Sequence, residues 1–118
     1  MSYIKHFKKI YSTDDRIKES ERLKQKYPNR IPIILDKDSS SYILNIDKHK
    51  YLVPDDYSVG QFIFLIRKRI KINDEQALFL YVNNFIPPNS SLISQLFKEY
   101  RDKDGFLYII YQGENVFG

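Results

Sequence analysis

Residues 59–70 place the strongest constraint on what this chain can fold into. Their apolar side chains recur at intervals of three and four residues, the spacing of one helix face, and these side chains are Val59, Phe62, Ile63, Ile66 and Ile70. Ser58 stands directly before them, where a serine hydroxyl can cap the first turn. A helix with one apolar face must be covered by another element, so we expect it to pack against a sheet.

Short apolar segments on both sides of this helix supply the strands of that sheet. From their β-branched and aromatic residues and the turns between them, we expect strands at 31–35, 48–53, 78–82 and 106–111. Pro54 ends the second strand and favours a place for it at the sheet edge, because proline has no N–H for the ladder.

Three further segments are expected to be helical. They lie at 3–10, 13–26 and 92–100, with cap candidates at Ser12, Thr13 and Ser91. The resulting order is helix, helix, β-β-α-β-α-β. This order predicts an α+β fold in which a four-stranded mixed sheet wraps one helix, a β-grasp, with two additional N-terminal helices.

Charge divides the chain into a basic front and a nearly neutral body. Residues 1–30 hold nine Lys or Arg and four Asp or Glu, a net charge of +5, and residues 31–118 hold ten and eleven, a net charge of −1. We therefore expect a helical extension at 1–27, a β-grasp domain at 28–112 and a flexible tail at 113–118. The simplest interpretation of the basic extension is a solvated helix face.

Composition excludes several kinds of chemistry. The chain has no cysteine, which rules out disulfides, thiolate metal sites, a cysteine nucleophile and lipid attachment through sulfur. The longest apolar run, Ala77–Val82, is far shorter than the ~20 residues of a membrane span. His6 and His49 have no triad or metal-ligand spacing around them, so we expect no enzyme, no metal and no cofactor.

Seven short segments form a distinctive combination from Asn29 onward. They read NRIPI at 29–33, DKHKYLVP at 47–54, VGQF at 59–62, IRKRI at 66–70, PP at 87–88, DKDGFLY at 102–108 and GENVFG at 113–118. Together they resemble the autophagy ubiquitin-like modifiers, the group that includes the microtubule-associated light chain 3 and GABA-receptor-associated proteins. The resemblance implies a ubiquitin-like β-grasp with two extra helices and a protein that is not an enzyme.

The resemblance gives Gly118 a chemical role. Ubiquitin-like activating and conjugating enzymes would join its carboxylate through an amide to phosphatidylethanolamine, and a cysteine protease would reverse the step. Glycine suits a narrow active-site channel because it lacks Cβ. The implied protein is a monomer, cytoplasmic until lipidation places it on autophagosome and related vesicle membranes. Whether Gly118 is encoded last or exposed by proteolysis stays open.

The resemblance also implies a peptide-binding site along the edge strand at 49–53. An extended peptide of the form aromatic-x-x-aliphatic, carried by cargo receptors and adaptors, would add to this edge by β-augmentation. Its aromatic pocket maps to Glu19, Leu23, Pro32, Ile34, Lys50, Leu52 and Phe106. Its aliphatic pocket maps to Tyr51, Val53, Pro54, Tyr57, Phe62, Leu65 and Arg67. Arg30 and Lys48 are accessory basic residues that would favour acidic flanking residues.

Each of these residues also has a simpler interpretation. Phe62 and the other apolar members can be core, and Lys50 and Tyr51 can belong to a solvated edge. Tyr57 stands where the family commonly has an aliphatic residue, which changes the shape or polarity of that pocket.

Two further surfaces are expected from the resemblance. Phe79 and Tyr81 share one face of their strand and map to a surface for conjugation or membrane function, although an aromatic pair facing the core is equally compatible with the sequence. The basic segment 5–9 could touch anionic lipid once Gly118 is anchored. Thr13 and Asp14 depart from the family's usual Phe-Glu pair, which predicts looser docking of the first helix.

Two other functions compete with this one. The run GFLYIIY at 105–111 is loosely similar to an RNA-binding strand motif, but Asp104 and Leu107 replace the basic and small residues of that motif, so we expect no nucleic acid. A ubiquitin-like peptide-binding adaptor that is never conjugated is the more serious alternative.

Overall fold

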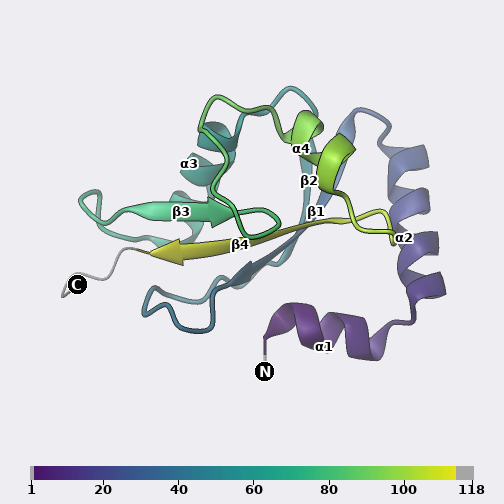
Figure 1. Cartoon of the computed structure of the whole chain (residues 1–118), viewed down its shortest axis with the longest axis horizontal. Helices are drawn as coiled ribbons and strands as arrows, with labels where there is room; N and C mark the ends of the chain where they lie inside the picture. Colours follow the sequence, from purple (N-terminus) through teal and green to yellow (C-terminus); the bar gives the residue numbers. More distant parts are fainter. Residues whose placement is uncertain (1, 114–118) are drawn as a thin grey trace.

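The computed structural model describes residues 2–113, and Figure 1 shows their arrangement. The helices and strands within these residues are, in chain order, α1 (Tyr3–Ile10), α2 (Thr13–Lys26), β1 (Arg30–Lys37), β2 (Lys50–Pro54), α3 (Val59–Ile70), β3 (Leu78–Tyr81), α4 (Ile93–Tyr100) and β4 (Leu107–Gly113). The element order predicted from the sequence is confirmed.

The strands form one mixed sheet in the order β2-β1-β4-β3. β1 is antiparallel to β2 and parallel to β4, and β3 is antiparallel to β4. Parallel neighbours need a long crossover, and α3 lies in the connection between them. The predicted β-grasp is confirmed, and so is the edge position expected for the strand that ends at Pro54.

One face of the sheet is covered by α3. Val59, Phe62, Ile66 and Ile70 are each at most 4% exposed, and Ile63 packs against the same cluster. Burying a side chain of this kind stabilises the fold by roughly 1.5–3 kcal/mol. Ser58 caps the helix through a capping box with Gln61. The helical stripe thus forms the centre of the main core.

The opposite face is covered by α1 and α2, which Figure 1 shows at the end of the molecule away from the tip of β4. Neighbouring residues of β1 point to opposite faces, so Ile33 and Leu35 join the main core while Ile34 lies in a second cluster. The buried members of this second cluster are Phe7, Leu23, Ile34 and Phe106.

A buried ion pair joins α2 to the turn before β4. Arg16 Nε donates to Asp104 Oδ2 at 2.9 Å, and the two side chains are 7% and 0% exposed. Ser20 Oγ also donates to the carbonyl oxygen of Asp104, at 2.6 Å. These contacts hold α2 against the β-grasp domain at a point 88 residues away in the chain.

The first helix docks firmly, so the looser docking expected from Thr13 and Asp14 is wrong. Phe7 is 4% exposed and meets Phe106 edge to face, with ring centroids 5.8 Å apart. The Ile4 N–H donates to Asp36 Oδ2 at 3.1 Å.

Other details differ from the sequence-based expectations. Ser91 does not cap α4, because the helix begins after Leu92 without a side-chain cap. The Ser91 carbonyl instead accepts from the Val59 N–H at 2.9 Å, tying the start of α3 to that loop. Gly113, expected to start the flexible tail, is the last residue of β4, and β2 begins at Lys50 where we expected 48.

Candidate functional site

The outer edge of β2 has no strand beside it among the described residues. In an antiparallel ladder, residue pairs whose backbone groups bond to each other alternate with pairs whose backbone groups point away from each other. Leu35 and His49 form a bonded pair, since the Leu35 N–H donates to the His49 carbonyl at 2.7 Å. Tyr51 and Val53 therefore direct their backbone groups toward β1. Lys50 and Leu52 direct theirs outward, where an extended peptide could pair with them.

The side chains of β2 alternate between two apolar regions. Tyr51 and Val53 point into the main core beneath α3, where they are 4% and 2% exposed. Leu52 packs on the second cluster beneath α1 and α2, and it is partly exposed. The free edge therefore runs between two apolar regions that lie on opposite faces of the sheet.

The residues expected for the aromatic pocket come together on the α2 side of this edge. Leu23, Ile34 and Phe106 are buried in the second cluster, and Pro32 pairs with Leu52 across the β1–β2 ladder. Phe7 belongs to the same cluster, although it is not among the residues the sequence suggested. The apolar floor of the expected pocket is present and Phe7 forms part of it.

Lys50 and Glu19 form the polar rim of this region. Lys50 Nζ lies 3.9 Å from Glu19 Oε1 and 5.9 Å from the centroid of the Phe7 ring. Glu19 also accepts from Arg22 Nη2 at 2.7 Å. The hydrogen bond from Arg22, and secondarily the charge of Lys50, lower the pKa of the Glu19 carboxyl. The rim is thus a charged pair that stays ionised and partly covers the apolar floor.

The residues expected for the aliphatic pocket divide into buried and accessible members. Phe62, Tyr51 and Val53 belong to the main core, and Phe62 is 0% exposed. Tyr57 and Leu65 are partly exposed and pack against that core from outside. The burial of Phe62 therefore agrees with the simpler interpretation, in which Phe62 is a core residue.

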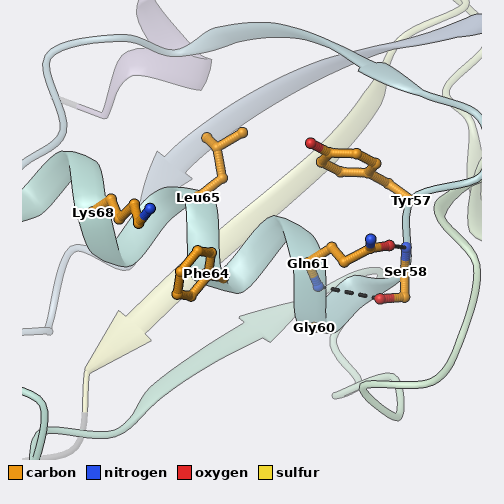
Figure 2. Close-up of a pocket in the computed structure, with 7 residues that line it drawn as sticks. All are labelled: Tyr57, Ser58, Gly60, Gln61, Phe64, Leu65 and Lys68. Carbon is orange, nitrogen blue, oxygen red and sulfur yellow. Dashed lines mark hydrogen bonds between the residues drawn. The ribbon is translucent and has the colours of Figure 1, made fainter.

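The accessible members line an open pocket beside α3. It has a volume of about 590 Å³ and is lined by Tyr57, Ser58, Gly60, Gln61, Phe64, Leu65 and Lys68. Figure 2 shows Leu65 and the Tyr57 ring pointing to the same side of α3, whereas Phe64 points away from them. The capping contacts between Gln61 and Ser58 are also drawn there, with the Gln61 N–H donating to Ser58 Oγ at 3.2 Å.

Arg67 of the expected aliphatic pocket and the accessory basic residues Arg30 and Lys48 already have contacts within the chain. Arg67 donates from Nη1 to the Gln76 carbonyl at 2.6 Å and from Nη2 to the Asn73 carbonyl at 2.9 Å, so it fastens the connection after α3. Arg30 Nη1 donates to the Leu52 carbonyl at 3.1 Å, on the outer edge itself. Lys48 Nζ lies 4.9 Å from the Tyr51 ring centroid. A docking strand would have to share the Leu52 carbonyl with Arg30.

Phe79 and Tyr81 lie on β3, at the opposite edge of the sheet. Leu78 and Leu80 of this strand point into the main core, so the two aromatic residues point to the other face. Phe79 is 37% exposed and Tyr81 is half-buried. They do not face the main core, and they form a surface separate from the β2 edge. Gly118 lies outside the described residues.

Sequence reasoning missed three residues that shape this region. Phe7 is buried through its contact with Phe106, and the sequence of the short helix at 3–10 does not show which element would cover it. Arg16 and Asp104 meet across 88 residues, and no local pattern encodes that distance.

Two absences within residues 2–113 complete the description. None of the helices there is both long and apolar enough to cross a membrane. The same residues bring together no group of three His, Asp or Glu side chains that could hold a metal ion.

A mixed sheet that wraps one helix, with two helices on its second face, defines a ubiquitin-like protein. Residues 15–118 match the family model described as Autophagy protein Atg8 ubiquitin like. The chain therefore belongs to the Atg8 family, and it is a ubiquitin-like autophagy modifier.

Individual relatives agree with this assignment. Autophagy-related protein 8 of Candida glabrata is 53% identical over 112 residues, which cover 95% of each chain. The protein of that name from Schizosaccharomyces pombe is 50% identical, covering 95% of this chain and 93% of its own. A crystal structure of Atg8 from Trypanosoma brucei superposes with a TM-score of 0.89 at 38% identity, covering 95% of this chain and 97% of that one.

Proposed function

We propose that this modifier acts by two linked activities, neither of them enzymatic. Its Gly118 carboxylate is joined to the amine of phosphatidylethanolamine, and its β2 edge binds aromatic-x-x-aliphatic peptides of cargo receptors and adaptors. Lipidation would move a cytoplasmic monomer to autophagosome and related vesicle membranes. The observation that carries the proposal is the β2 edge, which has no strand beside it among residues 2–113 and runs between two apolar regions on opposite faces of the sheet.

The spacing of the peptide motif fits this edge for a geometric reason. Side chains of an extended peptide alternate between faces, so residues three apart point to opposite faces. A peptide added to β2 would place its aromatic residue over the Leu52 side and its aliphatic residue over the Tyr57 and Leu65 side. Two motif residues at this spacing cover roughly 10 Å along the strand, and the outward backbone groups of Lys50 and Leu52 supply the hydrogen bonds.

Conjugation at Gly118 proceeds through three acyl transfers. An activating enzyme joins the carboxylate to AMP and releases pyrophosphate from ATP. A cysteine thiolate of that enzyme displaces AMP to form a thioester, which passes to the thiolate of a conjugating enzyme. The lipid amine then attacks the thioester, expels the thiolate and forms the amide. The modifier needs no thiol of its own, which agrees with its lack of cysteine.

The conjugation step is tested with Gly118→Ala, and Gly60→Ala is the matched control. A Cβ at Gly60 would meet its nearest atom at 3.4 Å, an ordinary contact, so the control should fold normally. We expect the control to form the lipid-linked species and vesicle puncta in cells, and Gly118→Ala to form neither. Lipid-linked puncta from Gly118→Ala would mean that conjugation does not use this residue.

Peptide binding is tested with the pair Lys50→Ala and Leu52→Ala. We expect the affinity for an aromatic-x-x-aliphatic peptide to fall tenfold or more, about 1.4 kcal/mol, as measured by calorimetric titration. Phe79→Ala on the opposite edge is the control and should bind normally. An unchanged affinity for the double variant would show that the peptide binds elsewhere. Normal peptide binding together with no conjugation of the wild type would instead favour the unconjugated adaptor.

A further inference from the structure

The loop between β1 and β2 presents two large apolar side chains to solvent. Tyr42 is 90% exposed and Leu44 is 60% exposed. Neither belongs to the β2 edge, to the pocket beside α3 or to the Phe79 surface. Figure 1 shows this loop next to the tip of β4, at the end of the molecule where the described chain stops. We call Tyr42 and Leu44 the loop pair.

The loop is anchored on the body of the protein by the buried residues that alternate with the loop pair. Ser41 and Ile43 alternate with the loop pair and are 8% and 4% exposed, so they anchor the segment on the core while the loop pair points outward. Tyr111 of β4 donates its phenol O–H to the Leu44 carbonyl at 2.8 Å. The outward direction of the two apolar side chains is therefore fixed by the fold.

The same loop is tied to the residue from which the C-terminal segment leaves the domain. The Gly113 N–H donates to Ser41 Oγ at 3.1 Å. A Cβ at Gly113 would lie 2.7 Å from Ile43 Cδ1, closer than real Cβ atoms approach, so the missing side chain lets the loop touch β4. Gly118 follows five residues later, and five extended residues reach at most about 17 Å.

From this placement we propose that the loop pair inserts into the bilayer interface beside the lipid joined to Gly118, and so orients the anchored protein. The inference rests on the proposed conjugation at Gly118. A tyrosine ring suits this depth because its body is apolar and its hydroxyl can remain among the headgroups, while the leucine enters the acyl region.

The charges around the loop favour a zwitterionic bilayer over a strongly charged partner. Asp47 is paired with Arg69, whose Nε lies 2.8 Å from Asp47 Oδ1. Asp38 accepts from Ser40 Oγ at 2.7 Å. Lys37 Nζ donates to the Ser41 carbonyl at 3.0 Å. Together Lys37, Asp38, Asp47 and Arg69 carry no net charge, and Lys48 adds a single positive charge to the same connection.

A bilayer also fits the size of the surface better than a protein does. Two side chains bury far less area than a stable protein interface, which needs about 1,200 Å² or more. A weak contact becomes effective when a tether keeps it close to its target, because the second binding step is then intramolecular. The lipid on Gly118 would be such a tether.

The experiment uses the full chain and supplies the anchor chemically. The sequence has no cysteine and no tryptophan, so Gly118→Cys gives one coupling site and Tyr42→Trp gives one fluorophore. The Gly118→Cys, Tyr42→Trp protein is coupled to maleimide-phosphatidylethanolamine in phosphatidylcholine vesicles, with and without brominated acyl chains. The matched control carries Gly118→Cys and Tyr11→Trp, because Tyr11 is 50% exposed at the junction of α1 and α2, far from the tip of β4.

We expect the emission of the tryptophan at position 42 to shift to the blue and to lose most of its intensity with brominated lipid, while the control stays unchanged. Adding Leu44→Ser to the position-42 protein should reduce the quenching. Emission at position 42 that stays as in solution would overturn the proposal, even if enzymatic conjugation at Gly118 succeeds. The proposal would also be overturned if the double variant Tyr42→Ser, Leu44→Ser were conjugated poorly by the enzymes while the tryptophan at position 42 showed no quenching. That combination would assign the loop pair to a protein partner. Failure of conjugation alone leaves the chemically anchored result standing, so the two failures are distinguishable.

Discussion

At the scale of single residues, Tyr51 has an unusual environment. Its side chain lies under α3 with its ring edge to face against Phe62, at a centroid distance of 5.5 Å. Its hydroxyl is buried and has no hydrogen-bond partner among the described residues. A buried hydroxyl without a partner has lost its hydration and gained nothing in exchange. The ring of Tyr51 is therefore well packed, but its buried hydroxyl lowers the stability of the fold.

We predict that Tyr51→Phe raises the free energy of unfolding by about 1 kcal/mol, because it keeps the ring and removes the unsatisfied hydroxyl. Urea unfolding followed by circular dichroism measures the change. Tyr111→Phe is the matched control, since the Tyr111 hydroxyl donates to the Leu44 carbonyl and its loss should lower stability. A clear loss of stability in Tyr51→Phe would show that the hydroxyl has a favourable interaction.

At the scale of elements, the junction of α2 with the turn before β4 depends on one carboxylate. Asp104 is fully buried and accepts from Arg16 Nε at 2.9 Å, from the Phe106 N–H at 2.9 Å and from the Tyr108 hydroxyl at 2.5 Å. Gly105 follows it at φ +90°, a left-handed angle that glycine adopts without strain. The N-terminal helices and the last strand are thus joined at this turn.

We predict that Arg16→Met destabilises the protein by about 3 kcal/mol or more, because it leaves a buried carboxylate without its counter-charge. Arg69→Met provides the control. It breaks the surface pair with Asp47, whose carboxylate is solvent-exposed, so a much smaller loss is expected. Urea unfolding measures the stability of both variants. Equal losses of stability would mean that the buried Arg16–Asp104 pair contributes no more than the exposed Arg69–Asp47 pair.

The local sequence pattern predicted a helix or strand well where its apolar residues repeat at a regular spacing. The helix at 59–70 has its expected bounds because the apolar stripe and the Ser58 cap agree. The cap expected at Ser91 is wrong because α4 begins one residue later, with Leu92 at the cap position. The docking of Phe7 and the Arg16–Asp104 pair were beyond reach, since both join segments far apart in the chain.

The residues of the candidate site were harder to predict from the sequence than the helices and strands. Period-two alternation in β2 is visible in the sequence, but which face each residue takes depends on its register with β1. The pocket residues came from the family resemblance, which cannot separate a core residue such as Phe62 from a rim residue such as Tyr57. Burial makes that separation, and their role in binding stays a prediction.

At the scale of the whole molecule, two buried tyrosines, Tyr51 and Tyr111, and the half-buried Tyr108 link stability to alkaline pH. Burial raises the pKa of the Tyr51 and Tyr111 phenols from 10.0 to about 12. Burial and the hydrogen bond to Asp104 raise the pKa of Tyr108 as well. The folded protein therefore keeps these phenols neutral at pH values where the unfolded chain ionises them.

We predict that stability is unaffected by these tyrosines below pH 10 and declines as pH rises to about 12, since ionisation then favours the unfolded chain. Urea midpoints and tyrosinate absorbance across this interval measure the effect. Tyr51→Phe should show a shallower decline than wild type. A constant urea midpoint over the whole interval would contradict the assignment.

The central position of β4 has a mechanical consequence. This strand is hydrogen-bonded to β1 on one side and to β3 on the other, and the chain continues from it toward Gly118. In the proposed lipid-linked form, a pull on this end would act along the axis of β4, so the bonds of both ladders would bear the force together. A peptide held at β2 would pass its own pull through β1 to the same strand. Cargo and anchor would thus load the sheet in shear, the direction in which its hydrogen bonds cannot be opened one at a time.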